Sequence, residues 1–177
     1  GIANYTTKSD VAGTLIGNGD TNKNLISAQG LFSTTTSDAS ISDLTLDNFT
    51  ITASQDKTGA LVGENAGTIS DVHVTNSTID GDIYSNIGGL VGNNRGTIEN
   101  SSSSATVSGG NYVGGLVGDN LQGTIETSYA TGAVSGNDYV GGLVGDNYRG
   151  TIETSYATGD VSGGSNVGGF AGYNSES

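Results

Sequence analysis

Two copies of one seven-residue segment, Gly-Gly-Leu-Val-Gly-Asp-Asn, constrain the fold of this chain more than any other feature. They occupy residues 114–120 and 141–147, and looser copies lie at 59–65, 88–94 and 168–174. Successive copies begin 29, 26, 27 and 27 residues apart. A fixed period in this range is typical of a repeat architecture, in which each unit buries its apolar face only against its neighbours. The sequence therefore predicts a single stack of repeats.

The composition favours such a stack over a conventional globular core and over disorder. The 177 residues include 31 glycines, no proline and only 33% hydrophobic residues, a poor supply for a compact core of ordinary shape. A disordered chain has no reason to keep Leu, Val and Ile in phase over several repeats. Helices are disfavoured, because glycine, β-branched residues, Ser and Asn prevail and no apolar stripe of helical spacing is present.

A second recurring segment supplies another strand to each repeat. It begins with Gly-Thr-Ile at Gly67, Gly96, Gly123 and Gly150, and with a degenerate copy that ends at Ile41. The third and fifth residues after each isoleucine change from apolar to small: Leu44 and Leu46, Val72 and Val74, Ser101 and Ser103, Ser128 and Ala130, Ser155 and Ala157. Side chains alternate along a strand, so these positions are expected to line an interior that narrows towards the C-terminus.

Val134 and Val161 mark a third short strand in their repeats. Three short strands in a unit of about 27 residues predict an all-β chain folded as a parallel β-helix, or β-solenoid, of about five coils. Each coil is one circuit of the solenoid, and its strands pair with their counterparts one coil away. Residues 1–12 are interpreted as a tail or edge strand, and residues 13–177 as one solenoid domain. Within that domain, 13–58 form an entry coil and 59–174 the repeats.

The repeats also resemble a known family. Tyr-Val-Gly-Gly-Leu-Val-Gly-Asp-Asn at 112–120, followed by Gly-Thr-Ile-Glu-Thr-Ser-Tyr-Ala-Thr-Gly-Ala-Val-Ser-Gly at 123–136, is similar to the GLUG repeat. This repeat occurs in bacterial surface and secreted proteins, including filamentous-haemagglutinin-like adhesins and the non-catalytic parts of IgA-specific metallopeptidases. The resemblance covers about residues 30–174. It implies a β-solenoid outside a bacterial cell or on its surface, and it supplies no active site.

Stacking by one repeat places equivalent residues in columns, so the search for function becomes a search among columns. One column is expected to be apolar and buried: Leu61, Leu90, Leu116, Leu143 and Phe170. A second contains asparagines: Asn65, Asn94, Asn120, Asn147 and Asn174. Amide side chains at tight turns can hydrogen-bond along a stack and satisfy turn backbone, so we interpret the second column as a structural ladder.

Carboxylates form two further columns, Glu99 with Glu126 and Glu153, and Asp119 with Asp146. Strict alternation would point the glutamates inwards, so a corner after the isoleucine is expected to turn them to solvent. Repulsion between exposed carboxylates is only ~1 kcal/mol in water, which favours simple solvation. The alternative is a divalent cation such as calcium, which prefers oxygen ligands. No other cofactor is expected.

Tyrosines form two short columns, Tyr129 with Tyr156 and Tyr112 with Tyr139. Aromatic rings bordered by Asn, Asp and Thr are the material of a glycan-binding surface. Cross-strand tyrosine pairs also stabilise a stack without any ligand, by up to ~1 kcal/mol each, and we favour this reading.

The charge balance restricts the partners. Five Lys and Arg against 18 Asp and Glu give a net charge of −13, which disfavours nucleic acid and anionic membrane surfaces. No apolar run is long enough for membrane insertion. His73 is the single histidine and no cysteine is present, so neither a zinc site nor a catalytic triad is expected. An enzyme is therefore the least favoured class.

Two functional hypotheses follow from these columns and from the resemblance. The first is a non-enzymatic rigid rod in an extracellular bacterial protein, with a surface for glycans or for host or other cells. The alternative is a subunit of an extracellular fibre, joined end to end through the open strand edges of the first and last coils, because unpaired edges are templates for association.

Overall fold

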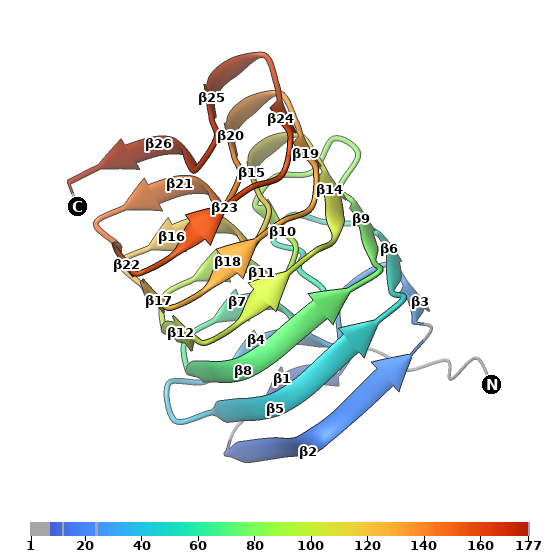
Figure 1. The fold of residues 1–177 in the computed structure, drawn as a ribbon. Coiled ribbons are helices and arrows are strands. Elements are labelled where there is room, and N and C mark those ends of the chain that lie inside the picture. Colours follow the sequence, from blue (N-terminus) through green and yellow to red (C-terminus); the bar gives the residue numbers. More distant parts are fainter. Residues whose placement is uncertain (1–7, 12, 24, 177) are drawn as a thin grey trace.

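The computed structural model describes residues 8–11, 13–23 and 25–176, and these form a parallel β-solenoid. The predicted fold class is confirmed: the described chain is all-β, without a helix, and winds through about six coils with three strands per coil and a spacing of ~27 residues. Figure 1 shows the coils stacked along one axis, with the N-terminal coils at one end and the C-terminal coils at the other.

Three sheets run along the stack, and we number them in the order in which the chain enters them. Sheet I consists of β1 (Lys8–Val11), β4 (Phe32–Thr35), β7 (Val62–Asn65), β11 (Val91–Asn94), β16 (Val117–Leu121), β21 (Val144–Tyr148) and β26 (Ala171–Ser175). Sheet II consists of β2 (Thr14–Lys23), β5 (Ser40–Asp47), β8 (Thr68–Thr75), β12 (Thr97–Glu99), β13 (Ser102–Ser103), β17 (Thr124–Glu126), β18 (Tyr129–Ala130), β22 (Thr151–Glu153) and β23 (Tyr156–Ala157).

Sheet III consists of β3 (Ile26–Ser27), β6 (Thr50–Thr52), β9 (Thr78–Asp80), β14 (Thr106–Ser108), β19 (Val134–Ser135) and β24 (Val161–Ser162). A short sheet IV joins in the later coils, with β10 (Ile87–Gly88), β15 (Asn111–Gly114), β20 (Asp138–Gly141) and β25 (Ser165–Gly168). Every pairing among these strands is parallel and joins equivalent residues of successive coils, as in Val91 with Val117 and Val117 with Val144. Register therefore follows the repeat.

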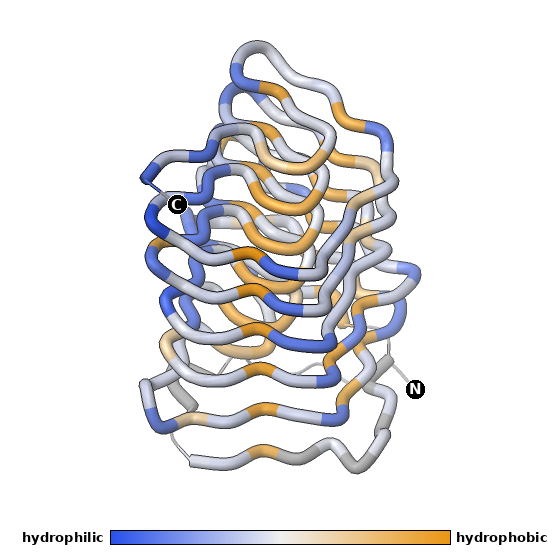
Figure 2. Tube along the Cα trace, turned by 60° about the vertical axis from the view of Figure 1, so that its left-hand side comes forward, coloured by the Kyte–Doolittle hydropathy of each residue, from blue (hydrophilic) through white to orange (hydrophobic). Residues whose placement is uncertain are grey.

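The core consists of apolar columns inside the stack. Ile69, Ile98 and Ile125 are fully buried at one position of sheet II, and Val91, Val117 and Val144 are fully buried at one position of sheet I. Figure 2 shows these hydrophobic positions aligned from coil to coil. Each side chain is covered mainly by its equivalents above and below, which is how a repeat with few apolar residues forms a core.

Each coil turns a corner within the sheet II segment, two residues after the isoleucine. The corner residues have left-handed φ values: Asp43 (56°), Asp71 (53°), Asn100 (48°), Thr127 (48°) and Thr154 (47°). This conformation interrupts the alternation of side chains, so that Ile69 and Val72 both face the core although they are three residues apart. The corner that the sequence required to turn the glutamates outwards is therefore present.

The first residues of the chain are described only in part. The tail or edge strand expected at residues 1–12 lies outside the described residues over 1–7 and at position 12. Its residues 8–11 form β1, which pairs in parallel with β4.

Candidate functional site: the stacked columns

The apolar column contains four fully buried leucines, Leu61, Leu90, Leu116 and Leu143. Their backbones are linked from coil to coil, as in the hydrogen bonds from Leu61 N to Leu90 O (3.0 Å) and from Leu116 N to Leu143 O (2.9 Å). The first glycine of each Gly-Gly pair is required by close packing, since a Cβ on Gly114 would collide with the carbonyl oxygen of Val117.

Phe170 corrects the expectation of a fully buried column. Its carbonyl oxygen accepts a hydrogen bond from Leu143 N (2.8 Å), so it continues the column in position. Its side chain is nevertheless 39% exposed. The reason is geometric: burial in a solenoid comes from the following coil, and no described residue stacks above Phe170.

The asparagine column is a continuous hydrogen-bonded ladder. Each Nδ2 donates to the Oδ1 of the next coil: Asn65 to Asn94 (2.8 Å), Asn94 to Asn120 (2.8 Å), Asn120 to Asn147 (2.7 Å) and Asn147 to Asn174 (2.8 Å). The same nitrogens donate across the corner to the carbonyl oxygens of Gly67, Gly96, Gly123 and Gly150 at 3.0–3.2 Å. Amide groups that are almost completely buried thus have partners for both protons, as buried polar groups require.

The start of this ladder was not predicted from the sequence. Thr35 Oγ1 donates to Asn65 Oδ1 (2.6 Å) and accepts from the backbone nitrogens of Ala66 and Gly67. Thr35 lies 30 residues before Asn65, so its spacing was the available signal, but a threonine did not match the asparagine pattern. At the other end, Asn174 is exposed in the last coil.

A second ladder consists of serines that replace apolar residues at the corner of sheet II. The hydroxyl oxygens accept from the backbone of the preceding coil: Val72 N to Ser101 Oγ, Ser101 N to Ser128 Oγ, and Ser128 N to Ser155 Oγ, each at 3.1 Å. The hydroxyls donate to the carbonyl oxygens of Glu99, Glu126 and Glu153 at 2.7–2.8 Å. The sequence was interpreted only as a change of side-chain size here, and hydrogen bonding is the additional reason for it.

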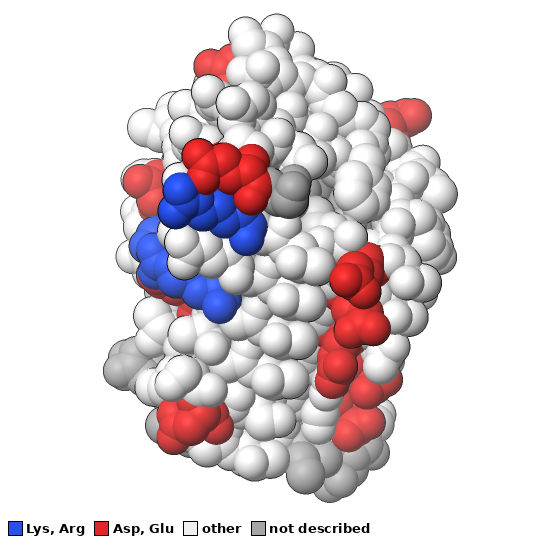
Figure 3. Space-filling view, turned by 90° about the vertical axis from the view of Figure 1, so that its left-hand side faces the viewer, with Lys and Arg blue, Asp and Glu red and all other residues white. Residues whose placement is uncertain are grey.

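The glutamate column lies on the outside of the stack, as the corner requires. Glu99 pairs in register with Glu126, and Glu126 with Glu153. Glu99 is half-buried and the other two are exposed. Figure 3 shows acidic side chains in a line along the stack, with the basic side chains gathered elsewhere on the same face. Within the part of the chain that the structure describes, no group of three or more His, Cys, Asp or Glu side chains could hold a metal ion.

The aspartate column is more enclosed. Asp119 and Asp146 pair in register on β16 and β21, and both are half-buried. Asp119 Oδ2 accepts hydrogen bonds from Asn86 Nδ2 (3.1 Å) and Asn93 Nδ2 (2.9 Å). Burial and, to a lesser extent, the charge of Asp146 raise the pKa of Asp119 to about 6, against the lowering effects of Asn93, Arg95 and Asn86. Burial also raises the pKa of Asp146.

Two oxygen atoms beside this pair are buried without a hydrogen-bond partner among the described residues, Asn93 Oδ1 and Asp146 Oδ1. Asn93 pairs with Asp119, and Asp119 with Asp146, so these two oxygens belong to coils that are two steps apart. Coils are spaced at ~4.8 Å, which prevents one small ion from binding both oxygens directly.

The predicted tyrosine pairs are stacked ring on ring. The ring centroids of Tyr112 and Tyr139 are 4.8 Å apart with planes 9° from parallel, and those of Tyr129 and Tyr156 are 4.9 Å apart at 1°. Tyr173, which the sequence did not single out, contacts Tyr139 edge to face at 5.7 Å. One face of each stacked ring is therefore covered by another tyrosine and is not free for a ligand.

Three of the basic residues, Lys57, Arg95 and Arg149, make ion pairs with glutamates. Lys57 Nζ lies 2.8 Å from Glu64 Oε2, and Arg95 contacts the other oxygen of the same carboxylate. Arg149 Nε lies 2.5 Å from Glu176 Oε2. His73 Nδ1 lies 2.8 Å from Ser102 Oγ and approaches no catalytic partner among the hydrogen bonds of the described residues.

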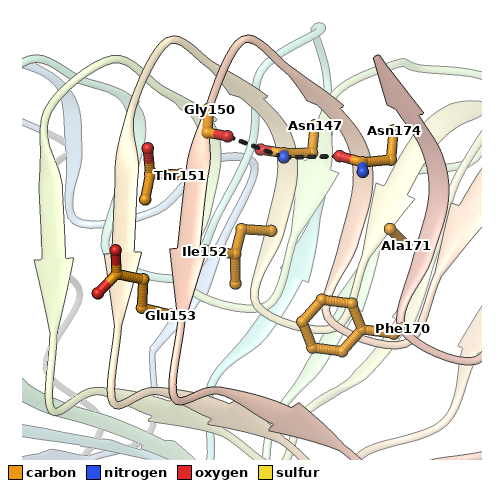
Figure 4. Close-up of a pocket in the computed structure, with 8 residues that line it drawn as sticks. All are labelled: Asn147, Gly150, Thr151, Ile152, Glu153, Phe170, Ala171 and Asn174. Carbon is orange, nitrogen blue, oxygen red and sulfur yellow. Dashed lines mark hydrogen bonds between the residues drawn. The ribbon is translucent and has the colours of Figure 1, made fainter. Parts of the chain in front are cut away.

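A hollow of about 360 Å³ lies at the C-terminal end of the stack, between the last two coils. It is lined by Asn147, Gly150, Thr151, Ile152, Glu153, Phe170, Ala171 and Asn174. Figure 4 shows Ile152, Phe170 and Ala171 on one side of this hollow and the final rung of the asparagine ladder on the other. These are core positions that lack a covering coil, so the hollow is the open end of the core rather than a cleft built for a reaction.

Three coils of this stack match a known family of sequence repeats. The family model of the GLUG motif fits residues 83–108, 109–135 and 136–162, which are consecutive segments one coil long. No curated protein and no solved structure matches the chain. The described residues contain no helix, and therefore none that is long and apolar enough to cross a membrane.

Proposed function

Because this chain is a GLUG-repeat protein whose repeats stack as a β-solenoid, we propose that it is a non-enzymatic structural repeat domain. Its role is to act as a rigid rod segment in an extracellular or surface protein of a bacterium. The resemblance to surface and secreted proteins supports this location.

The asparagine ladder is the observation that carries this proposal. It runs without interruption from Thr35 to Asn174, and each rung joins neighbouring coils by a buried amide hydrogen bond. A buried polar network that is fully satisfied rigidifies the structure around it and specifies one register. Bending the stack or sliding one coil would break rungs and leave buried amides unpaired, which opposes both motions.

The rod proposal is tested by changing the number of coils. Copies of residues 109–135 inserted after residue 135 should lengthen the particle by about 4.8 Å per copy, as measured by small-angle X-ray scattering. Five extra copies should therefore add roughly 24 Å to the maximum dimension, with the cross-section unchanged. A particle that widens, aggregates or keeps its length would contradict the proposal.

A surface for glycans or cells is the finer version of this function. Tyr156 and Tyr173 are the described tyrosines with the most exposed side chains, 51% and 46% respectively, and they are the residues that would present ring faces to a sugar. The stacking of the other rings instead supports a structural role for the tyrosine columns. Binding on a glycan array that is lost in a Tyr156→Ala variant would add adhesion to the rod function, whereas no binding would leave the rod function alone.

Fibre formation from joined subunits is the second candidate function, favoured by the open end of the core. Phe170 and Val167 are 39% and 42% exposed there. Light scattering at increasing concentration distinguishes the two: assemblies that a Phe170→Asp variant dissociates support the fibre, and a monomer throughout supports the rod.

A further inference from the structure

Asp119 and Asp146 are two neighbouring carboxylates in a partly buried position, where the repulsion between two negative charges is unfavourable. They occupy equivalent positions in neighbouring coils, on strands that are hydrogen-bonded to each other in register. Both side chains are half-buried. The glutamate column contains the same coil-to-coil repetition, but Glu126 and Glu153 are exposed and water screens their charges. The enclosed pair lacks this screening.

The hydrogen bonds around the pair identify which oxygens are in use. Asp119 Oδ2 accepts from two amide groups, those of Asn86 and Asn93. Asp146 Oδ1 is buried and has no donor among the described residues. A buried carboxylate oxygen without a donor loses the hydrogen bonds that it makes with water in the unfolded chain, so a donor is needed at this position.

Cations do not provide a good solution, because the column offers too few oxygens at one point. Asn93 Oδ1, the other unpaired oxygen, belongs to the coil on the far side of Asp119. An ion between Asp119 and Asp146 would have only those two carboxylates as protein ligands, where calcium takes six to eight oxygens. A proton requires only two oxygen atoms.

We propose that Asp119 and Asp146 share one proton and so form a pH-sensitive link between the coils of β16 and β21. Asp119 holds the proton on Oδ1, which donates to Asp146 Oδ1, while Asp119 Oδ2 continues to accept from the two asparagines. One carboxyl group is neutral and one is charged. The repulsion between the coils is thereby replaced by a hydrogen bond that is available only while the proton is bound.

The surroundings of the pair contain charges of both signs. Apart from Asp146, the ionisable groups that interact with Asp119 are Arg95 after β11 and Tyr112 of β15. Tyr173 of β26 pairs in register with Asp146, Asp138 and Tyr139 of β20 interact with Tyr112, and Glu64 of β7 pairs in register with Asn93. Arg95 is the one that favours the charged form of Asp119, and it is already paired with Glu64. Burial and the charge of Asp146 therefore set the upward direction of the pKa shift of Asp119.

The direction of the pH effect follows from linkage. The pKa of Asp119 in the folded chain, about 6, lies above its ordinary value of 3.8, so the folded state holds a proton that the unfolded state releases. The stabilisation is complete below the ordinary pKa and is lost as the pH rises through about 6. The solenoid should therefore become less stable between about pH 4 and pH 6, and this loss should level off above the folded pKa.

The test compares the melting temperature of the intact chain with that of Asp119→Asn at several pH values across this range. Asparagine keeps the shape and can donate to Asp146 at any pH, so the variant should lose the dependence. Glu126→Gln removes one charge from the exposed column and is the matched control, which should keep the dependence of the parent chain. Each variant removes one negative charge from the parent net charge of −13, so the change in general repulsion is the same in both and cancels between Asp119→Asn and its control.

A second measurement uses the unmodified chain, so its main result does not depend on whether a variant folds. The side-chain carboxyl ¹³C shift of Asp119 in the unmodified chain should titrate near pH 6, and Asp146→Asn should move that titration downwards. Titration of Asp119 in the ordinary range near pH 4, or equal pH dependence of the parent chain and Asp119→Asn, would overturn the proposal.

Discussion

The early coils and the later coils of this solenoid have the same outline but different interiors. In β5 and β8 the sheet II segment is one unbroken strand of eight residues, and its inward residues Leu44, Leu46, Val72 and Val74 are apolar and buried. In the later coils the segment divides into two strands, as in β12 and β13, which both pair with β8. Serines occupy the inward corner there.

This difference shows that a repeat can exchange apolar burial for hydrogen bonds if the buried hydroxyl finds backbone partners. Ser101 and Ser128 are almost fully buried, yet each hydroxyl both donates and accepts. The donor is a backbone nitrogen of the preceding coil and the acceptor is a carbonyl oxygen of the same coil, so Ser101 is satisfied although the preceding coil has Val72 at this position. The polar interior of the later coils therefore depends on backbone groups that the stacking of coils brings into reach.

The largest expected effect tests burial itself. Leu116→Asp places an unpaired charge in a fully buried column, so we expect a loss of about 4 kcal/mol or more and a chain that no longer melts cooperatively. Phe170→Asp changes the same column at its exposed end and should lower the melting temperature only slightly. Circular dichroism during heating measures both. Equal destabilisation by the two changes would contradict the view that the following coil provides burial.

The next effect concerns the asparagine ladder. Asn120→Ala removes one hydrogen bond from each of three groups, Asn94 Nδ2, Asn147 Oδ1 and the carbonyl of Gly123, so we expect a loss of roughly 2–4 kcal/mol in denaturant unfolding. Asn174→Ala is the matched control at the exposed end and should cost less than about 1 kcal/mol. If Asn120→Ala proved as mild as its control, the ladder would not be what holds the register.

The serine ladder gives a smaller effect, and it sharpens the contrast between early and later coils. Ser128→Ala leaves Ser101 N without its acceptor and removes one of two donors to Glu126 O, which keeps Asn100 N, and we expect a loss of about 1–2 kcal/mol. Ser162→Ala, at an exposed position, should change the free energy of unfolding by less than about 0.5 kcal/mol. A neutral or stabilising Ser128→Ala would show that size alone selects serine at this corner.

The smallest effect is that of the tyrosine columns. A double-mutant cycle of Tyr129→Ala and Tyr156→Ala should give a coupling energy of about 0.5–1 kcal/mol, in the range of other aromatic pairs across strands. The same cycle on Tyr129 and Tyr112, which belong to different columns, is the control and should give none. A coupling near zero for the stacked pair would remove the structural role and return the tyrosines to the search for a ligand.

The repeat spacing was sufficient to predict the solenoid, because one-coil register follows directly from the period. It placed Asn120 above Asn94 and Tyr156 above Tyr129, as the structure has them. The exposure of Phe170 could not be read from the pattern, since it depends on what lies beyond the residue in space. The enclosure of Asp119 and the hydrogen bonds of Ser101 were also missed, because both depend on contacts with a neighbouring coil whose side-chain positions the spacing does not specify.

Cross-linking between coils is the most direct test of the central claim, that register follows the repeat. The chain contains no cysteine, so introduced pairs can be measured without background. Thr124 and Thr151 face each other in successive coils, at a spacing that suits a disulfide, whereas Thr97 and Thr151 are two coils apart, beyond the ~7 Å limit. We predict that a Thr124→Cys, Thr151→Cys variant closes rapidly under mild oxidation and loses both free thiols, while Thr97→Cys, Thr151→Cys stays reduced. Closure of the second pair but not the first would contradict the account.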